Sequence, residues 1–316
     1  MTHTVSIQVP ATTANIGPGF DCLGVALSLY NRFQFSLLSA VSVPDTEPVI
    51  IHANGQGADQ LPTDAENLVY QAFVATYQHL GLTPPAVKID IHLDIPQARG
   101  LGSSATAIVA GLMGANALAN GSLKTSELLQ LAIALEGHPD NVVPAMMGGC
   151  CLAAKDLETD QWQICPIAWS PKIAPIVAIP DFELKTDLAR NALPQTCTYA
   201  DAVFNMAHLG FLMKGLEQAD AVLLKTALQD KLHQPYRCHL IPGFEIAQRA
   251  ALQAGAYGLV ISGAGPTLLA LGDAESAAAI ALGLRNHWQV SDLSVETRVL
   301  RLDRQGAVVQ SVQNPS

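Results

Sequence analysis

Alternating apolar and polar residues mark the clearest strand of the chain. Between residues 87 and 95 every odd position is apolar and every even position is polar. A period of two buries one face of a strand and exposes the other, so this segment is predicted to be a half-exposed strand. The same pattern predicts shorter strands over Thr4–Val9 and Val49–Ala53. From Pro10 to Asp21 the chain is polar and contains glycine, so we predict a loop there.

Helical spacing follows in the middle of the chain. Residues 64–79 and 126–136 repeat apolar residues every three or four positions, and 103–119 is a run of small residues typical of a buried helix. The segment 137–151 is rich in glycine and proline and predicts turns. Further on, the pattern predicts helices near 186–192, 199–215, 216–232, 244–254 and 274–286 and strands near 173–179, 258–262, 267–271 and 295–302.

The length of the chain and a change in pattern predict two domains. The 316 residues are about twice the ~150 residues of a typical domain. Periodicity is lost near 155–170, so we divide the chain into domains 1–165 and 166–316. Strands and helices are mixed without a strict βαβ rhythm, and the alternating strand suggests a sheet with one exposed face. An α+β fold is therefore favoured over a doubly wound one.

Composition excludes several classes of protein. Apolar residues make up 49% of the chain and charged residues 14%, which predicts a large core rather than disorder. A net charge of −10 and 5% aromatic residues argue against a nucleic-acid-binding surface. No apolar run approaches the ~18 residues of a membrane span, and the first residues do not resemble a signal peptide. Six cysteines without a C-x-x-C pair favour a reduced, cytoplasmic protein.

A glycine-rich loop, G-L-G-S-S-A over residues 100–105, lies between a predicted strand and a predicted helix. Two glycines allow a tight turn, and Ser103 and Ser104 are suitable helix N-caps, so the helix start can face a phosphate. An ordinary glycine loop with a serine cap explains the same residues equally well. A Walker A motif is absent. The dinucleotide fingerprint is disfavoured, because Pro96–Arg99 separate the loop from the strand and residues 119–125 contain no acid.

Three ordered motifs identify a family resemblance. I-P-Q-A-R-G-L-G-S-S-A-T (Ile95–Thr106), V-P-A-T-T-A-N-I-G-P-G-F-D-C-L-G (Val9–Gly24) and S-G-A-G-P-T (Ser262–Thr267) resemble the signatures of the GHMP kinases. The N-terminal motif (Val9–Gly24), together with Glu136–Ala145, Lys185–Arg190 and Asp230–Arg237, is similar to the branch of that family that phosphorylates L-homoserine in threonine biosynthesis.

The resemblance implies a fold, cofactors and a partner. The expected fold has an N-terminal domain like ribosomal protein S5 domain 2 and a C-terminal ferredoxin-like domain. The expected cofactors are ATP and Mg²⁺, and the expected partner is a small-molecule substrate, L-homoserine, with no nucleic acid and no membrane. Because the family is often dimeric, a homodimer is a further expectation. Two alternatives stay open: a related kinase for shikimate or a mevalonate-type alcohol, and a catalytically silent nucleotide-binding protein of the same fold.

Five polar residues are candidates for substrate binding. A guanidinium matches a carboxylate bidentately, so Arg190 and Arg237 suit the carboxylate of an amino acid. Thr186 lies one helical turn before Arg190 and can face the same cleft. Asn15 and Asp21 flank the glycine–proline turn and suit the amino and hydroxyl ends of the substrate. Surface charge for the arginines and turn chemistry for Asn15 and Asp21 are the simpler alternatives.

Asp140, Asn141 and Arg190 are the candidate catalytic residues. By resemblance, Asp140 and Asn141 lie on a loop that faces the substrate hydroxyl. Some relatives use an aspartate base backed by a lysine, but no lysine occurs near the N-terminal motif (Val9–Gly24), and the first lysine of the chain is Lys88. We therefore expect catalysis by positioning, without a dedicated strong base. His138 suggests a metal through His-x-Asp, but without a third ligand a structural histidine is favoured.

The resemblance also assigns the nucleotide and metal ligands. Asn67 resembles the family position that meets the adenine or ribose, and Ser104 and Glu136 are expected to bind Mg²⁺ through oxygen. For Glu136, which ends a predicted helix, a salt bridge is the alternative. The expected nucleotide-binding residues of the loop are Pro96, Gln97, Ala98, Arg99, Gly100, Leu101, Gly102, Ser103, Ser104 and Ala105.

Overall fold

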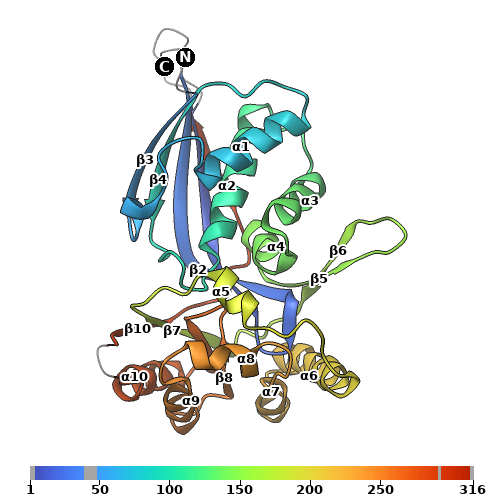
Figure 1. Cartoon of the computed structure of the whole chain (residues 1–316), viewed down its shortest axis with the longest axis vertical. Coiled ribbons are helices and arrows are strands. Elements are labelled where there is room, and N and C mark those ends of the chain that lie inside the picture. Colours follow the sequence, from blue (N-terminus) through green and yellow to red (C-terminus); the bar gives the residue numbers. More distant parts are fainter. Residues whose placement is uncertain (1–3, 39–47, 291–292, 314–316) are drawn as a thin grey trace.

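A computed structural model describes residues 4–38, 48–290 and 293–313. It has two halves, one above the other in Figure 1, each a sheet covered by helices. In the upper half four helices lie on one side of the sheet. The elements of this half are β1 (Thr4–Asn15), β2 (Gly19–Leu37), β3 (Val49–Gly55), η1 (Ala58–Gln60), α1 (Leu68–His79), β4 (Val87–Leu93), α2 (Ser103–Leu118), α3 (Thr125–Glu136), α4 (Pro139–Met147), β5 (Cys150–Lys155), β6 (Trp162–Ile167) and, from the end of the chain, β11 (Val308–Gln313).

The two longest strands replace the loop predicted over residues 10–21, which was wrong. β1 continues to Asn15, and β2 begins at Gly19 after a short turn. Residues 9–15 are all buried, so this stretch shows no alternation of apolar and polar residues. The Thr12 side chain in this stretch lies directly against Gly102, at the start of α2. The Thr12 amide donates to the Leu101 carbonyl at 3.1 Å.

The order of strands in the first sheet is β11-β1-β2-β4-β3. In addition, β5 pairs with the beginning of β2, and β6 pairs with β5. Among the described strands of this sheet, only β3 and β4 pair in parallel. The turns predicted over 137–151 were wrong in part, because α4 and the start of β5 occupy this segment. Pro139 stands in the first turn of α4, where a missing amide costs nothing, so a residue that suggests a turn instead starts a helix.

The second half contains a four-stranded antiparallel sheet in the order β10-β7-β9-β8. Along the chain the strands follow as β7, β8, β9 and β10, with helices between β7 and β8 and between β9 and β10. Together with the spatial order, this is the ferredoxin-like arrangement. The remaining elements are β7 (Ile173–Pro180), α5 (Thr186–Asn191), α6 (Tyr199–Gln218), α7 (Ala221–Ala227), α8 (Gln234–Arg237), η2 (Cys238–Leu240), α9 (Phe244–Gln253), β8 (Gly258–Ile261), β9 (Leu268–Asp273), α10 (Ala277–His287) and β10 (Val295–Val299).

The single helix predicted over 216–232 was also wrong. α6 runs on to Gln218, and Ala219 then takes a left-handed conformation that ends it. Asp220 starts α7 by accepting hydrogen bonds from the amides of Val222 and Leu223. The chain leaves helical conformation after α7, and Asp230 then organises the next turn. Within the part of the chain that is described, no helix is long and apolar enough to cross a membrane.

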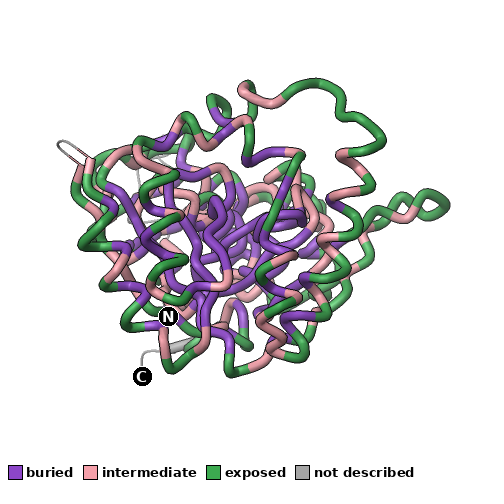
Figure 2. Tube along the Cα trace, turned by 90° about the horizontal axis from the view of Figure 1, so that it is seen from below, coloured by how far each residue is buried: buried purple, intermediate pink, exposed green. Residues whose placement is uncertain are grey.

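A shared hydrophobic core joins the two halves. One cluster combines Ile16 and Leu101 of the first half with Val177, Val260 and Leu269 of the second. Figure 2 shows buried positions running through the centre of the molecule, with exposed positions at the rim. The last strand, β11, also returns to pair with β1. The domain division at 165/166 stays a prediction, and the chain crosses back over it at its end.

Candidate active site

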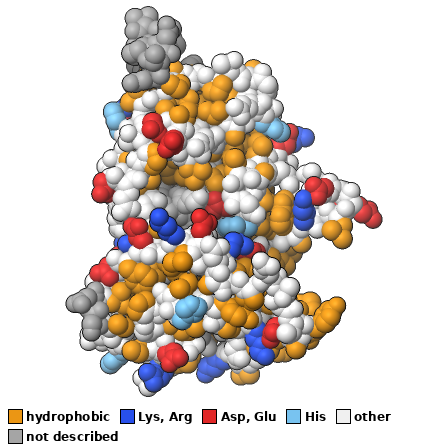
Figure 3. Space-filling view, viewed as in Figure 1, with side chains coloured by type: hydrophobic (Ala, Val, Ile, Leu, Met, Phe, Trp, Pro, Cys, Tyr) orange, Lys and Arg blue, Asp and Glu red, His pale blue; other side chains and the backbone are white. Residues whose placement is uncertain are grey.

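A cavity of about 560 Å³ lies between the two halves and is lined by residues of both. Figure 3 shows acidic and basic side chains gathered at the waist of the molecule, where the halves meet. The fold brings together most of the residues that the sequence predicted. Those that line the cavity are Asn15, Asp21, Asn67, Gln97, Ala98, Arg99, Gly100, Gly102, Ser103, Ser104, Glu136, Asp140, Asn141, Thr186, Arg190 and Arg237.

Three residues of the predicted nucleotide loop do not line the cavity. Ala105 is buried in the hydrophobic core of the first half. Leu101 is buried in the core that the two halves share. Pro96 is half-buried beside the loop. The side chains of Leu101 and Ala105 therefore hold the loop against the core, while their neighbours face the cavity.

The glycine-rich loop starts α2 with a glycine rather than a serine. The N-cap of α2 is Gly102, with φ 68°, so the prediction that a serine caps this helix was wrong. A side chain at Gly102 would run into the Thr12 hydroxyl, which explains the glycine. Ser103 instead lines the cavity, and among the described residues its buried hydroxyl has no hydrogen-bond partner. An unpaired hydroxyl beside a helix N-terminus fits an anionic group such as a phosphate.

The S-G-A-G-P-T turn ties this loop to the second half. The Ser262 hydroxyl hydrogen-bonds the Gly100 carbonyl at 2.6 Å and the Thr13 hydroxyl at 2.7 Å. The Thr267 amide donates to the Arg99 carbonyl at 3.2 Å. Gly100 has φ 76°, and a side chain there would come within 2.8 Å of the Gly265 carbonyl oxygen. The turn therefore fixes the conformation of the loop from the opposite side of the cavity.

Glu136 and Ser104 form an oxygen pair at the cavity wall. The Ser104 hydroxyl donates to Glu136 Oε2 at 2.8 Å. Burial raises the pKa of Glu136, against the lowering effect of the Ser104 hydrogen bond and the His138 charge. A carboxylate and a hydroxyl are ligands that suit Mg²⁺, which takes one or two protein oxygens and completes its shell with water and phosphate. No group of three or more His, Cys, Asp or Glu able to hold a metal occurs among the described residues.

Asp140, at the start of α4, is the most buried carboxylate of the cavity wall. His138 Nδ1 lies 2.6 Å from Asp140 Oδ1. Burial lowers the pKa of His138, but the hydrogen bond and charge of Asp140 outweigh it, so the pKa is raised overall. Asn141 donates to Asp140 at 3.3 Å and accepts from the Thr12 hydroxyl at 2.9 Å. His138 was predicted to be structural, and the structure places it in the cavity wall as the partner of Asp140.

A close approach between two elements sets the position of Asp140. A side chain at Gly24 in β2 would run into the Asp140 carbonyl oxygen. The backbone of α4 therefore lies directly against β2, which only a glycine allows. This contact carries the Asp140 side chain to the cavity edge of the first sheet.

Asp21 and Arg190 join the two halves across the cavity. Arg190 donates from both terminal nitrogens to the two Asp21 oxygens, each at 3.0 Å. The Asp21 amide donates to Asn15 Oδ1 at 2.9 Å, and both residues have positive φ. The hydrogen bond from Arg190 to Asp21 raises the pKa of the guanidinium. Asn and Asp tolerate this left-handed backbone better than other residues, so the turn and the site use the same side chains.

Arg237 is a buried cation held by carbonyl groups. It is 2% exposed, its Nε donates to the Ala189 carbonyl at 3.1 Å, and Nη1 donates to the Gly263 carbonyl at 3.3 Å. Asn15 donates to the same Gly263 oxygen at 2.9 Å. Burial lowers the pKa of Arg237, and no carboxylate forms a salt bridge with it within the described ranges. A buried guanidinium facing a cavity is a strong site for an anion.

The remaining end of the cavity is apolar. Asn67 caps α1 by accepting from the Val69 amide at 3.0 Å, and it donates to the Pro62 carbonyl at 2.6 Å. Its side chain therefore shapes the loop before α1. The sequence reasoning missed several residues that line the cavity, including Lys185, which directly precedes the predicted Thr186. The missed apolar lining consists of Phe33, Leu61, Pro62, Leu68, Val69, Ile91 and Leu93.

Comparison with known proteins places this site in a family. The family profile of the GHMP kinases N terminal domain matches residues 67–149, and that of the GHMP kinases C terminal domain matches residues 212–290. The homoserine kinase of Microchaete diplosiphon is 55% identical over 304 residues, which cover 96% of each chain. That of Trichormus variabilis is 54% identical over 304 residues, 96% of this chain and 98% of the relative.

A solved structure agrees with these matches. The crystal structure of homoserine kinase from Cytophaga hutchinsonii superposes with a TM-score of 0.86 at 30% identity and covers 97% of each chain. The chain therefore belongs to the GHMP kinase family, and within it to the homoserine kinases. The predicted α+β GHMP kinase fold and the kinase assignment are confirmed.

Proposed function

We propose that the protein transfers the terminal phosphoryl group of Mg-ATP to the side-chain hydroxyl of L-homoserine, a step of threonine biosynthesis. The homoserine oxygen forms a bond to phosphorus, the bond from phosphorus to the ADP oxygen breaks, and the hydroxyl proton is released to water. The products are O-phospho-L-homoserine and ADP. The buried Arg237 carries this proposal, because a guanidinium that lines the cavity without a carboxylate partner among the described residues suits the carboxylate of an amino acid.

The nucleotide occupies the end of the cavity formed by the first half. The start of α2 and the free Ser103 hydroxyl receive the phosphates, and the loop glycines let the backbone approach them. The apolar residues around Pro62 and Val69 accept the adenine ring. Asn67 acts by holding the Pro62 segment in place.

Ser104 and Glu136 are the residues that would hold Mg²⁺. Their oxygens lie together at the cavity wall, close to the phosphate loop, and the burial of Glu136 favours a cation beside it. When bound, the ion supplies neutralisation of the phosphate charge during transfer.

The amino-acid end binds homoserine by its charged groups. Arg237 and Arg190 bind the carboxylate, and Asp21 and Asn15 accept from the ammonium group. These four side chains converge around the Gly263 carbonyl and the turn after β1. Thr186, in the first turn of α5, lines the same end. The hydroxyl of the substrate then points toward Asp140 and Asn141.

Catalysis proceeds by positioning and charge stabilisation, without a dedicated strong base. Asp140 already accepts from His138 and Asn141, so its charge is partly satisfied by the protein. Phosphoryl transfer through a loose transition state needs little proton abstraction before the new bond forms. An Asp140→Asn variant is therefore expected to keep measurable turnover. Complete loss of turnover with both substrates still bound would contradict this part of the proposal.

The experiment that tests the function measures ADP release from Mg-ATP with L-homoserine, mevalonate, shikimate and galactose side by side. We expect turnover with homoserine alone. Turnover with another alcohol instead would keep the nucleotide assignment and overturn the roles of the arginines. Nucleotide binding without turnover of any acceptor would support the alternative of a silent nucleotide-binding protein.

We also propose a cytoplasmic location and a homodimer. All six cysteines are free thiols, which suits a reducing compartment. Light scattering of the purified protein tests the dimer, and a mass of one chain would contradict it.

A further inference from the structure

Two aromatic rings are stacked behind the amino-acid end of the cavity. The rings of Phe20 and His233 have centroids 5.3 Å apart and planes inclined by 20°. The guanidinium carbons of Arg237 and Arg190 lie 5.4 and 6.0 Å from the Phe20 centroid. Neither Phe20 nor His233 lines the cavity, but both arginines do. The stack therefore contacts the two proposed carboxylate ligands without facing the substrate.

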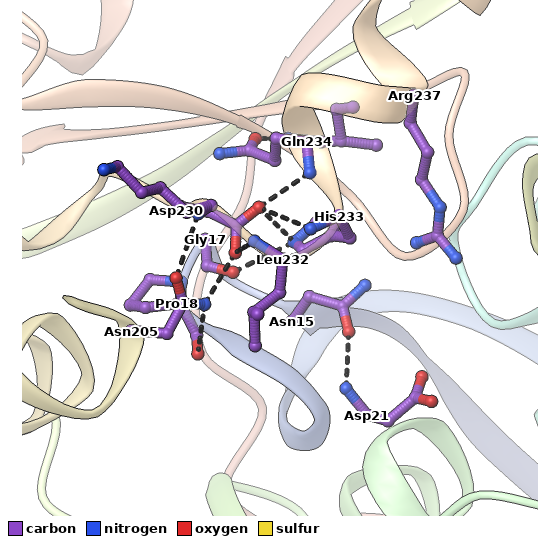
Figure 4. Close-up of polar contacts among 12 residues, drawn as sticks. Asn15, Gly17, Pro18, Asp21, Asn205, Asp230, Leu232, His233, Gln234 and Arg237 are labelled. Atoms are coloured by element: carbon purple, nitrogen blue, oxygen red, sulfur yellow. Dashed lines mark hydrogen bonds and ion pairs between the residues drawn. The ribbon is translucent and has the colours of Figure 1, made fainter. Parts of the chain in front are cut away.

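His233 is fixed on both sides. Its Nε2 donates to the Gly17 carbonyl at 2.9 Å, in the turn that carries Phe20 and Asp21. Its backbone amide donates to Asp230 Oδ2 at 2.9 Å, as Figure 4 shows. The ring is fully buried, and burial lowers its pKa. Nδ1 has no hydrogen-bond partner among the described residues and Nε2 faces a carbonyl, so these contacts fit an imidazole with its proton on Nε2. Its ring is thus a rigid support for Phe20 rather than a charged group.

Asp230 anchors the support to the second half of the molecule. Its Oδ2 also accepts from the Gln234 amide at 2.6 Å, and its Oδ1 accepts from Asn205 Nδ2 at 2.7 Å (Figure 4). Asn205 donates in addition to the Pro18 carbonyl at 3.3 Å. The turn at residues 17–18 and the segment that leads into α8, which ends at Arg237, are therefore held as one unit.

Two like charges beside one another need such a support. Burial lowers the pKa of Arg237, the charge of Asp21 opposes this, and the charge of Arg190 lowers the pKa further, because the two guanidinium groups repel each other. Arg190 has a carboxylate partner in Asp21, but the hydrogen-bond partners of Arg237 among the described residues are carbonyl oxygens. The face of an aromatic ring attracts cations, and Phe20 offers such a ring to both.

We propose that Phe20 and His233 are positioning residues that set the affinity and selectivity for the substrate carboxylate. Phe20 holds the two guanidinium groups at the spacing of one carboxylate, and His233 holds Phe20. This inference rests on the proposed function, because it assumes an amino-acid substrate. It predicts that damage to the stack weakens homoserine binding and leaves ATP binding unchanged.

The test compares Phe20→Leu, His233→Leu and His233→Gln by initial-rate kinetics. Phe20→Leu and His233→Leu should each raise KM for L-homoserine about tenfold, which lies between the values for an exposed and a desolvated cation–π contact, with KM for ATP within about twofold. His233→Gln places an amide near the position of Nε2 and should restore the bond to Gly17 and most of the affinity. His208→Leu is the matched control, because His208 also donates to a backbone carbonyl but packs on Phe204 within α6.

A second readout separates positioning from general stability. Propanolamine is homoserine with a hydrogen atom in place of the carboxylate. The wild-type protein should prefer homoserine over propanolamine strongly, measured as substrates or as competing inhibitors. In Phe20→Leu this preference should shrink about tenfold, which a loss of folded protein cannot produce, since it would scale both compounds equally. If Phe20→Leu does not fold, Phe20→Met fills the same space without the ring and serves instead.

The inference is overturned if the variants change both KM values together, or leave the preference for the carboxylate at its wild-type value. Its failure is distinct from failure of the proposed function. A wild-type protein that does not phosphorylate homoserine would contradict the function itself, whereas a wild-type kinase with unaffected variants would contradict only the role of the stack.

Discussion

In the proposed arrangement, the phosphate loop at the nucleotide end of the cavity comes from one stretch of chain, whereas the amino-acid end collects side chains from four stretches. Residues 97–107 supply the loop and helix start that face the phosphates. The amino-acid end takes Asn15 and Asp21 from the end of β1 and the start of β2, Asp140 from α4, Arg190 from α5 and Arg237 from α8. The first end recognises its ligand largely through backbone groups, and the second through charged side chains.

This difference predicts how each end fails. A backbone site is damaged by side chains that change the path of the chain, so its sensitive residues are glycines. A side-chain site is damaged by removal of charge, and its sensitive residues are the arginines and their supports. Substitutions at one end should therefore leave the other ligand's binding intact, because a shared hydrophobic core keeps the halves together.

The largest effect is expected at the amino-acid end from Arg237→Leu. Removing one partner of a buried charge pair costs 2–5 kcal/mol by general experience, so kcat/KM for homoserine should fall about a thousandfold. KM for ATP should stay within about twofold. Arg249→Leu, at an exposed position on α9, is the control with the same loss of charge. A parallel rise of the KM values for homoserine and ATP in Arg237→Leu would contradict the claim that the two ends bind their ligands separately.

At the nucleotide end, Gly102→Ala should raise KM for ATP about thirtyfold, because left-handed backbone costs an L-residue 1–2 kcal/mol and the new methyl group also meets Thr12. Gly121→Ala is the matched control. Gly121 has the same φ of 68°, but no atom lies within 4 Å of the added carbon. It should lose stability and keep its ATP affinity. Equal loss of ATP affinity in both variants would contradict the proposed contact.

The Glu136→Gln variant tests the proposed role of Glu136 in binding Mg²⁺. Loss of the carboxylate charge should raise the Mg²⁺ concentration needed for half-maximal rate at least about tenfold, the usual cost of disturbing a metal ligand shell. KM for homoserine should change little. The measurement is the initial rate as a function of Mg²⁺ at saturating ATP. An unchanged Mg²⁺ requirement would show that Glu136 forms only the hydrogen bond to Ser104.

A smaller effect concerns pH and the pair His138–Asp140. The hydrogen bond and charge of Asp140 outweigh burial and hold the folded-state pKa of His138 above its ordinary value of 6.5. The folded protein therefore binds this proton more tightly than the unfolded chain, and the stabilisation is complete below pH 6.5. It is lost as pH rises through the folded-state pKa. Urea unfolding of wild type and His138→Gln should show a difference that shrinks as pH is raised. A difference that grows with pH would contradict the assignment.

The smallest effect is expected from Asn67→Ala. Loss of an N-cap side chain costs about 1 kcal/mol of unfolding free energy. KM for ATP should rise severalfold, because the Pro62 segment loses its hydrogen bond. Asn67→Asp keeps the oxygen that caps α1 and should recover the stability but not the ATP affinity. Full recovery of both by Asn67→Asp would assign the whole effect to the helix cap.

The sequence predicts best those elements and site residues that a local pattern marks. Strand β4 and helix α2 were predicted nearly to the residue, because each is marked by a local pattern. Strand β2 was missed altogether, because no element was predicted over residues 22–37. Its middle, residues 23–27, is buried on both faces and has no alternation to detect. The phosphate loop was located from local chemistry. The motif resemblance supplied the remaining candidate residues.

What the sequence did not predict depends on contacts between distant segments. The sequence favoured a structural role for His138. Its pairing with Asp140 in the cavity wall depends on the packing of α4 against β2, which no local pattern shows. The support of Arg237 by Phe20 and His233 joins positions more than two hundred residues apart. Neither residue shows a separate signal in the sequence, because phenylalanine and histidine are common in cores. The residues that hold a site in place are therefore harder to find than those that touch its ligand.

The most direct test of the account is calorimetric titration of L-homoserine and of a non-hydrolysable ATP analogue into wild type, Arg237→Leu and Gly102→Ala. The account predicts that wild type binds both, that Arg237→Leu loses homoserine and keeps the nucleotide, and that Gly102→Ala does the reverse. Loss of the nucleotide by Arg237→Leu, or of homoserine by Gly102→Ala, would show that the two ends of the cavity are not separate sites and would contradict the account.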